Sequence, residues 1–154
     1  MKRQKYLNVR MKIIRKIIDY FRRYFDIKTD TGLWGEKEAE KHLKLEKYLI
    51  IGRRIRITRR EEIDLIAERE KTLVFVEVKT RASENYGRPI DAVNKSKKHV
   101  LSRAMVRYLK KMKNYPEYIR FDVIEVIGTP GKGVPEIRHI ENAFQLQKPY
   151  DLPY

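Results

Sequence analysis

Three charged residues stand inside two stretches whose composition is otherwise typical of buried β-strands. Asp64 lies in the run 62–67, and Glu77 and Lys79 lie in the run 74–81. Alternate side chains of a strand share one face, so Glu77 and Lys79 project to the same side, and a hairpin would bring Asp64 and Glu77 within reach of one ion. Two carboxylates that converge at the end of a buried strand repel each other and lose hydration, so they favour a divalent cation.

The lysine indicates the chemistry that such a cation would serve. Lys79 would supply a positive charge to a water molecule or a phosphate oxygen near an ion held by Asp64 and Glu77. The alternative is a salt-bridged strand end, in which Lys79 neutralises Glu77 or Asp64. Spacing alone leaves both interpretations open.

Other residue types exclude several chemistries. The chain has no cysteine, which excludes a disulfide framework, a cysteine zinc site and a thiol nucleophile. The three histidines, His42, His99 and His139, are far apart in sequence and form no metal-binding pair at helical spacing. The glycine-rich run 128–133 lacks the Ser or Thr of a phosphate-binding loop, so we expect a turn there.

The elements that position Asp64 and Glu77 follow from hydrophobic spacing. Short runs rich in branched residues, separated by charged turns, predict a meander of antiparallel strands between two helices. We expect a helix over 31–46, strands at 48–51, 55–58, 63–67 and 73–79, a helix within 90–112, and strands at 121–127 and 136–140. This order is typical of an α/β fold with a mixed sheet.

Residues 1–28 differ from the rest of the chain in charge. They hold ten Lys and Arg against two Asp and Glu, a balance of +8 within a total of +15. Their apolar spacing predicts a basic amphipathic helix, followed by one domain over 29–154. The helix would lie on DNA or an anionic membrane, or pack its apolar stripe on the domain or a second copy, and we favour packing over membrane binding.

The overall charge predicts a partner with negative charge. A net charge of +15 is typical of proteins that bind nucleic acid. No segment approaches 18 uncharged apolar residues, and no signal peptide is evident, so we expect a cytoplasmic protein without a membrane-spanning helix. Nothing in the chain predicts a small-molecule cofactor.

An ordered series of motifs runs from about Gly32 to Phe144. In chain order it reads Gly32-x-x-Gly-Glu36-x-x-Ala, Glu62-Ile-Asp-Leu-Ile-Ala, Val74-Phe-Val-Glu-Val-Lys-Thr-Arg, Tyr86-Gly-x-Pro, Ala92-Val with Lys97, Arg120-Phe-Asp-Val-Ile, and Ile140-Glu-Asn-Ala-Phe. The series resembles the YraN family of predicted nucleases, within the PD-(D/E)xK nuclease superfamily. Its opening is also similar to that of archaeal Holliday-junction resolvases, which are homodimers acting on branched DNA.

The resemblance implies a restriction-endonuclease-like fold, with a three-layer core in which helices flank a central mixed β-sheet, plus the extra N-terminal amphipathic helix. It implies that Asp64 and Glu77 hold Mg²⁺ or Mn²⁺ together with the backbone carbonyl of Val78. Lys79 would orient the attacking water, and Glu36 would complete the metal shell. Hard oxygen ligands suit both ions.

The implied activity is that of an endodeoxyribonuclease that hydrolyses phosphodiester bonds in branched or structured DNA during recombination or repair, as a homodimer. Candidate nucleic-acid contacts are Arg54, Arg56, Arg81 and Lys97, and the alternative for them is solvated surface charge. The alternative function is a non-cleaving nucleic-acid-binding protein with the same fold.

The chain departs from the family pattern at three positions, none of which is a candidate ligand. Glu61 stands where the family usually has Gly, Arg54 where it usually has Asn, and Lys47 where a Gly often precedes the Tyr.

Overall fold

The computed structural model of this chain describes residues 30–83, 85 and 87–153. The amphipathic helix predicted for residues 1–28 lies outside the described residues, so the division of the chain at residue 28 stays a prediction.

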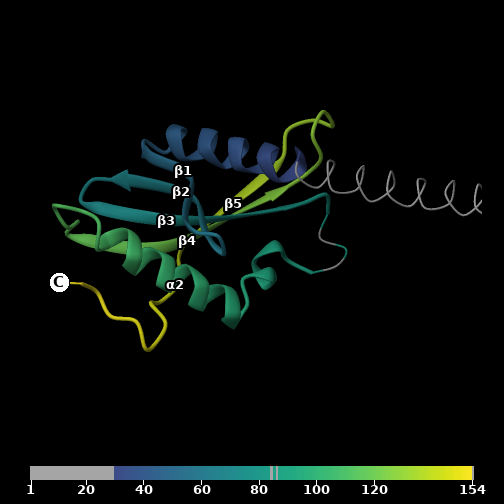
Figure 1. The fold of residues 1–154 in the computed structure, drawn as a ribbon. Helices are drawn as coiled ribbons and strands as arrows, with labels where there is room; N and C mark the ends of the chain where they lie inside the picture. The colour runs from purple at the N-terminus through teal and green to yellow at the C-terminus, as the bar shows by residue number, and fades with distance from the viewer. Residues whose placement is uncertain (1–29, 84, 86, 154) are drawn as a thin grey trace, which may run out of the picture.

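Five strands form one sheet in the order β1-β2-β3-β4-β5 (Figure 1). The strands β3 and β4 pair in parallel, whereas β1–β2, β2–β3 and β4–β5 are antiparallel. The sheet is therefore mixed, as predicted. The strand bounds are β1 Leu49–Thr58, β2 Glu61–Arg69, β3 Thr72–Arg81, β4 Tyr118–Ile127 and β5 Glu136–Phe144.

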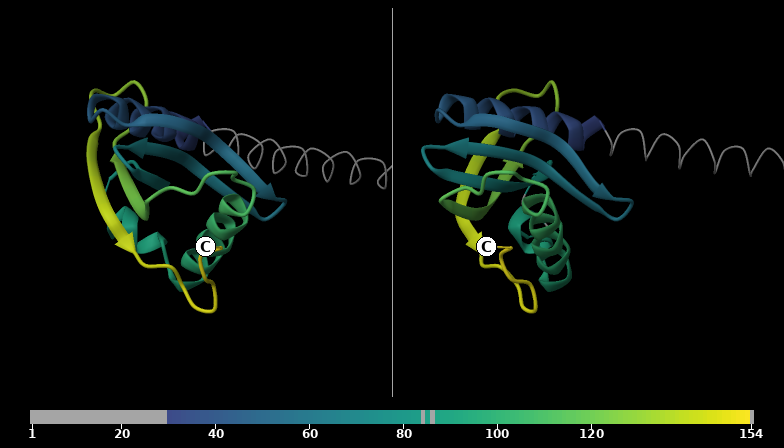
Figure 2. Two further views of the ribbon diagram at one scale, coloured as in Figure 1. Left: turned by 90° about the vertical axis from the view of Figure 1, so that its left-hand side faces the viewer. Right: turned by 60° about the vertical axis from the view of Figure 1, so that its left-hand side comes forward.

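Two helices cover the two faces of the sheet. A parallel strand pair needs a crossover, and here it consists of the short 3₁₀ helix η1 (Pro89–Ala92) and α2 (Lys95–Leu109). Residues 30–45 form a second helix, called helix 30–45 below. Figure 2 shows helix 30–45 and α2 on opposite sides of the sheet. The described part of the chain is thus an α/β fold compatible with a three-layer core.

Each face of the sheet carries its own apolar cluster. Leu101, Met105 and Leu109 of α2 pack on one face, and Ala39 and Leu43 of helix 30–45 pack on the other. Along β3, Leu73 and Phe75 join the α2 cluster, whereas Val74, Val76 and Val78 join the opposite one. The run 73–76, which is apolar at every position, is therefore buried on both faces, as expected of a central strand.

Two elements differ from the prediction in their extent. The segments 48–51 and 55–58 belong to one strand, β1, because the intervening residues keep their pairing with β2 across an irregular register. The helical spacing over 90–112 overestimates α2, because Asn94 ends the preceding turn and caps the helix by accepting the Lys97 N–H with its side chain at 3.0 Å.

Helix 30–45 ends in a left-handed residue. Lys47 has φ 63°, the Tyr48 N–H donates to the Leu43 carbonyl, and the Lys47 N–H donates to the Lys44 carbonyl. These two bonds form a Schellman motif, whose left-handed position favours glycine. This explains why a glycine suits the position where this chain has Lys47.

Replacing Lys47 by glycine is expected to stabilise the protein by about 0.5–1 kcal/mol, because the strain of a left-handed side chain exceeds the added flexibility of the unfolded chain. Urea unfolding measures the change. Lys37→Gly, at an exposed position inside the same helix, is the matched control and should destabilise by about 1 kcal/mol. A loss of stability in Lys47→Gly would contradict the assignment of strain to this residue.

Candidate active site

Glu77 is the most deeply buried member of the site, with 2% of its surface exposed. It lies on β3 on the side of α2, and its Oε1 accepts from the ammonium groups of Lys79 at 2.5 Å and Lys97 at 2.9 Å. Its Oε2 has no hydrogen-bond partner; among the described residues, Glu125 Oε2 is the other buried side-chain oxygen in this condition. A buried polar atom without a partner costs free energy, so a further donor or a cation at this oxygen would be stabilising.

Asp64 lies beside Glu77 on the neighbouring strand. Its Oδ2 accepts the backbone N–H of Val78 at 2.8 Å. Burial, and then repulsion from Glu77, raise the pKa of Asp64 to about 7, although the Val78 N–H and the charges of Lys97 and Lys79 oppose the shift. Burial of the Asp64 carboxylate next to a second carboxylate therefore disfavours its charged form, even though two ammonium groups lie nearby.

Glu36 approaches the same cluster from helix 30–45. Burial raises its pKa, the charge of Arg54 opposes the shift, and the negative charges of Glu62 and Glu77 add to it. The Arg54 Nε lies 3.8 Å from Glu36 Oε2 and 3.4 Å from Glu62 Oε1. The structure thus gathers Glu36, Asp64, Glu77 and the two lysines around one end of β3.

Gly35 allows helix 30–45 to come this close to the strand. A Cβ at Gly35 would stand 1.8 Å from Thr80 Oγ1 and 3.0 Å from Thr80 Cβ. Thr80 follows Lys79 directly, so this contact places Glu36 beside the end of β3. By contrast, a Cβ at Gly32 would meet nothing within 4 Å.

Gly35→Ala is expected to destabilise the protein by about 1–3 kcal/mol, because the helix must move away from β3 to make room for the methyl group. Gly32→Ala is the control, with the same added methyl in the same helix, and should be neutral or stabilise by up to about 1 kcal/mol. Thermal melting of both variants measures the difference. Equal melting temperatures would mean that the close approach at Thr80 is unimportant.

Three of the four predicted nucleic-acid contacts already have acidic neighbours. Lys97 contacts Glu77, and Arg56 contacts Glu62 at 3.1 Å, as Arg54 does at 3.4 Å. Arg81 is half-buried at the end of β3. Three of the four therefore belong to one charged network around the carboxylates. They are not independent surface charges.

Glu125 is a neighbour of the site that the sequence prediction missed. It is the cross-strand partner of Lys79, has no exposed surface, and accepts the Ile90 N–H at 2.7 Å. Its Oε2 lies 3.7 Å from guanidinium nitrogens of Arg88 and Arg138. The sequence did contain a signal for Glu125. It is an acidic residue within the largely apolar run 121–127, and an acidic residue within an apolar strand is the pattern that identified Glu77 as a candidate.

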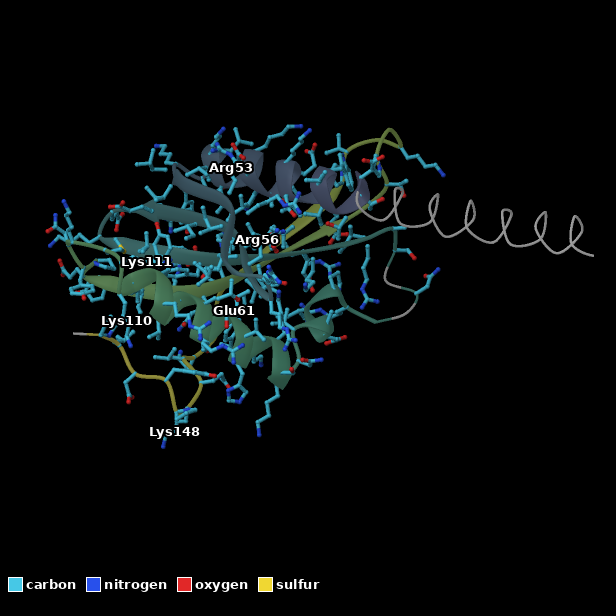
Figure 3. The ribbon with its side chains drawn as sticks, in the orientation of Figure 1. Arg53, Arg56, Glu61, Lys110, Lys111 and Lys148 are labelled. Atoms are coloured by element: carbon cyan, nitrogen blue, oxygen red, sulfur yellow. The ribbon has the colours of Figure 1, made fainter. Side chains whose placement is uncertain are left out.

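Glu61, one of the departures from the family pattern, joins β2 to α2. It is 2% exposed and pairs with Arg103 and Arg107 of the helix. Burial alone would raise the pKa of Glu61, but the hydrogen bonds from the two arginines hold it below its ordinary value. Figure 3 labels Glu61 at the start of β2, where the strand meets α2. Glu61 therefore serves to attach α2 to the sheet.

The donor set suits a magnesium-type ion. Within residues 30–83, 85 and 87–153, no three Asp, Glu or His side chains come close enough to form a complete metal cage. Mg²⁺ needs only one or two carboxylates, because it retains several of its waters. Asp64 and Glu77 provide two hard oxygen donors, and Glu77 Oε2 is free of other bonds, so these residues fit such an ion.

Fold and site together define an α/β protein with a cluster of buried carboxylates and lysines at the end of a central strand. The chain belongs to the uncharacterised protein family UPF0102, whose sequence model matches residues 35–126. That range includes Glu36, Asp64, Glu77, Lys79 and Lys97.

Three relatives are similar over most of their length. A UPF0102 protein of Syntrophomonas wolfei is 41% identical over 115 residues, covering 75% of this chain and 97% of the relative. One from Geobacter metallireducens is 43% identical over 115 residues, covering 75% and 92%. One from Symbiobacterium thermophilum is 44% identical over 113 residues, covering 73% and 94%. These names assign no activity. None of the described helices has the length and apolar character needed to cross a membrane.

Proposed function

We propose that this protein is a Mg²⁺- or Mn²⁺-dependent endonuclease of the PD-(D/E)xK type, with a restriction-endonuclease-like fold, that hydrolyses phosphodiester bonds in branched or otherwise structured DNA. The observation that carries the proposal is the pair Asp64 and Glu77. Their repulsion and burial raise the pKa of Asp64 to about 7, and Glu77 Oε2 is buried without a partner. Such a pair is best compensated by a divalent cation.

Each residue has a role in this function. Glu77 would hold the cation through Oε2 and Asp64 through Oδ1, since the Asp64 Oδ2 accepts the Val78 N–H. The Val78 carbonyl would add a further oxygen, and Glu36 would complete the shell through a bound water. When bound, the cation supplies positive charge that stabilises the developing charge on the phosphate and acidifies water.

The lysines serve the substrate side of the site. In this proposal Lys79, whose ammonium group contacts Glu77 Oε1, orients an attacking water and offsets negative charge on the scissile phosphate. Lys97 brings a second ammonium group to the same carboxylate from α2. The two positive charges favour a substrate that carries phosphate next to the carboxylates.

The charge of the chain supports DNA as the substrate. A net charge of +15 favours a polyanion, and its affinity should fall steeply with salt as counterions are released. A branched junction presents two related cleavage positions, so we include a homodimer in the proposal. The location that goes with this function is the cytoplasm.

One observation favours the non-cleaving alternative. Lys79 and Lys97 both contact Glu77 Oε1, and two ammonium groups are enough to neutralise that carboxylate without a cation. In that case the protein would bind nucleic acid, and the ion pairs would only stabilise the strand end.

The decisive experiment incubates the purified full chain with linear, flapped and four-way DNA in Mg²⁺, in Mn²⁺ and in EDTA. We expect cleavage of the flapped or four-way substrate in either metal and none in EDTA. Binding of all three substrates without any cleavage, together with no metal uptake by calorimetry, would support the non-cleaving alternative.

A further inference from the structure

A pocket of about 300 Å³ opens beside the candidate active site. It lies between η1, the first turn of α2 and the strands β4 and β5. Its lining combines the charged side chains of Asp91 and Lys98 with five apolar residues, Ile90, Val93, Val123, Ala143 and Phe144. The volume is at the lower end of the range of about 300–1,000 Å³ that is usual for small-molecule pockets, so it suits one planar ring system.

The pocket and the carboxylates are immediate neighbours. Val123, in the wall, is the cross-strand partner of Glu77 in the parallel pair β3–β4, and adjacent strands lie about 4.8 Å apart. Two consecutive residues of α2 also link the pocket to the carboxylates. Lys97 contacts Glu77, and Lys98 lines the pocket. A DNA strand with a phosphate at Glu77 therefore has the pocket within reach of an adjoining base.

The lining offers a nucleobase an apolar contact and polar edge contacts. One face of the Phe144 ring stacks on Phe121 at 4.5 Å and the residue is 8% exposed, so only a small part of the ring is accessible, with the Lys98 ammonium 5.7 Å from the ring centre. Asp91 contributes the pocket's carboxylate, which is oriented because its Oδ2 accepts the Arg88 backbone N–H at 3.0 Å. A carboxylate only accepts hydrogen bonds, and guanine presents two neighbouring N–H donors on its pairing edge.

We propose that this pocket binds one unpaired base of the DNA strand whose phosphate lies at Asp64 and Glu77, with a preference for guanine. The inference rests on the proposed function for the position of the strand. It adds a reason for a preference for structured DNA, because a base in an intact duplex is stacked and paired and cannot enter the pocket without being extruded.

Binding in EDTA tests the pocket independently of cleavage. The probes are fluorescent duplexes that carry one bulged guanine, one bulged thymine or one bulged abasic site. We expect the full chain to bind the guanine bulge about tenfold more tightly than the abasic bulge, with the thymine bulge between them. Equal affinity for the guanine and abasic bulges would overturn the proposal.

Two variants and a control assign the effect to the pocket. Ala143→Leu fills the pocket and should bring the guanine bulge to the affinity of the abasic bulge. Asp91→Asn should remove the difference between guanine and thymine. Ala92→Leu makes the same change at an exposed residue that does not line the pocket, and should behave as wild type. Melting curves confirm that each variant is folded, and a base preference that survives Ala143→Leu in the folded protein would place base recognition elsewhere.

The failure of this inference and that of the proposed function are distinguishable. Metal-dependent cleavage without any base preference in EDTA would leave the nuclease and remove the pocket. Base preference without metal uptake or cleavage would leave the pocket as part of a nucleic-acid-binding protein. Guanosine monophosphate that binds as tightly as the bulged duplex would assign the pocket to a free nucleotide and overturn the role in DNA recognition.

Discussion

Asp64→Asn and Glu77→Gln are each expected to lower Mg²⁺-dependent DNA cleavage by about 100-fold or more, whereas DNA binding without metal should stay equal or become tighter. An amide keeps the shape of the carboxylate but is a poorer ligand for a hard cation. Removing negative charge from a site that faces phosphate also reduces repulsion. Single-turnover rates at saturating protein separate the chemical step from binding.

Lys79→Ala should reduce cleavage by about 10²–10⁴-fold but leave metal uptake largely in place, because an ammonium group has no lone pair to donate to a metal. Lys110→Ala is the matched control. It removes the same charge from an exposed residue just after α2, at the end of the helix away from Lys97 (Figure 3). We expect its cleavage rate to equal that of the wild type.

Calorimetric titration of Mn²⁺ distinguishes a metal-dependent active site from a structural salt bridge at the end of β3. If the wild type takes up no metal, and if the variants at Asp64, Glu77 and Lys79 act only by lowering the melting temperature, then the cluster is structural. Breaking a buried ion pair costs about 3–5 kcal/mol, so that outcome would be plain in the melting curves.

Local sequence patterns predicted that Asp64, Glu77 and Lys79, on two neighbouring strands, lie close together. Alternation along β3 places Glu77 and Lys79 on one face, and a tight β2–β3 hairpin brings Asp64 next to them, so three neighbours in space were already close in sequence. The continuous apolar run 73–76 fits a central strand that is buried on both faces. These relations need only the pleat and a short turn.

The missing part depends on how distant elements pack. The contact of Lys97 with Glu77 and the pairing of Arg103 and Arg107 with Glu61 require the placement of α2 after a crossover. The place of Glu125 next to Lys79 requires the register of a parallel pair, which no local turn determines. The continuity of β1 likewise depends on its pairing with β2.

The metal-free protein is expected to lose stability as the pH rises from about 4 to about 7. The pKa of Asp64 is raised from its ordinary value of 3.8 to about 7, so the folded protein holds this proton more tightly than the unfolded chain does. The unfolded state releases its proton first, and the free energy of unfolding therefore falls through this window and levels off above it. Each pKa unit corresponds to about 1.4 kcal/mol, so the raised pKa of Asp64 corresponds to a loss of up to about 4 kcal/mol.

Asp64→Asn should remove most of this pH dependence and should be about 2 kcal/mol more stable than the wild type at pH 8 without metal, because its amide oxygen still accepts the Val78 N–H while the charge is gone. Mn²⁺ should stabilise the wild type at that pH and have little effect on the variant. Urea unfolding from pH 2 to 8 measures both. Glu40→Gln is a control of opposite sign. The hydrogen bond from Arg53 lowers the pKa of Glu40 to about 2, so the stability that this hydrogen bond contributes is lost only as the pH falls below about 4.

The free energy of unfolding of the metal-free wild type could instead rise from pH 4 to 7. That result would mean that Lys79 and Lys97 stabilise the charged pair on their own, and that this strand end needs no cation.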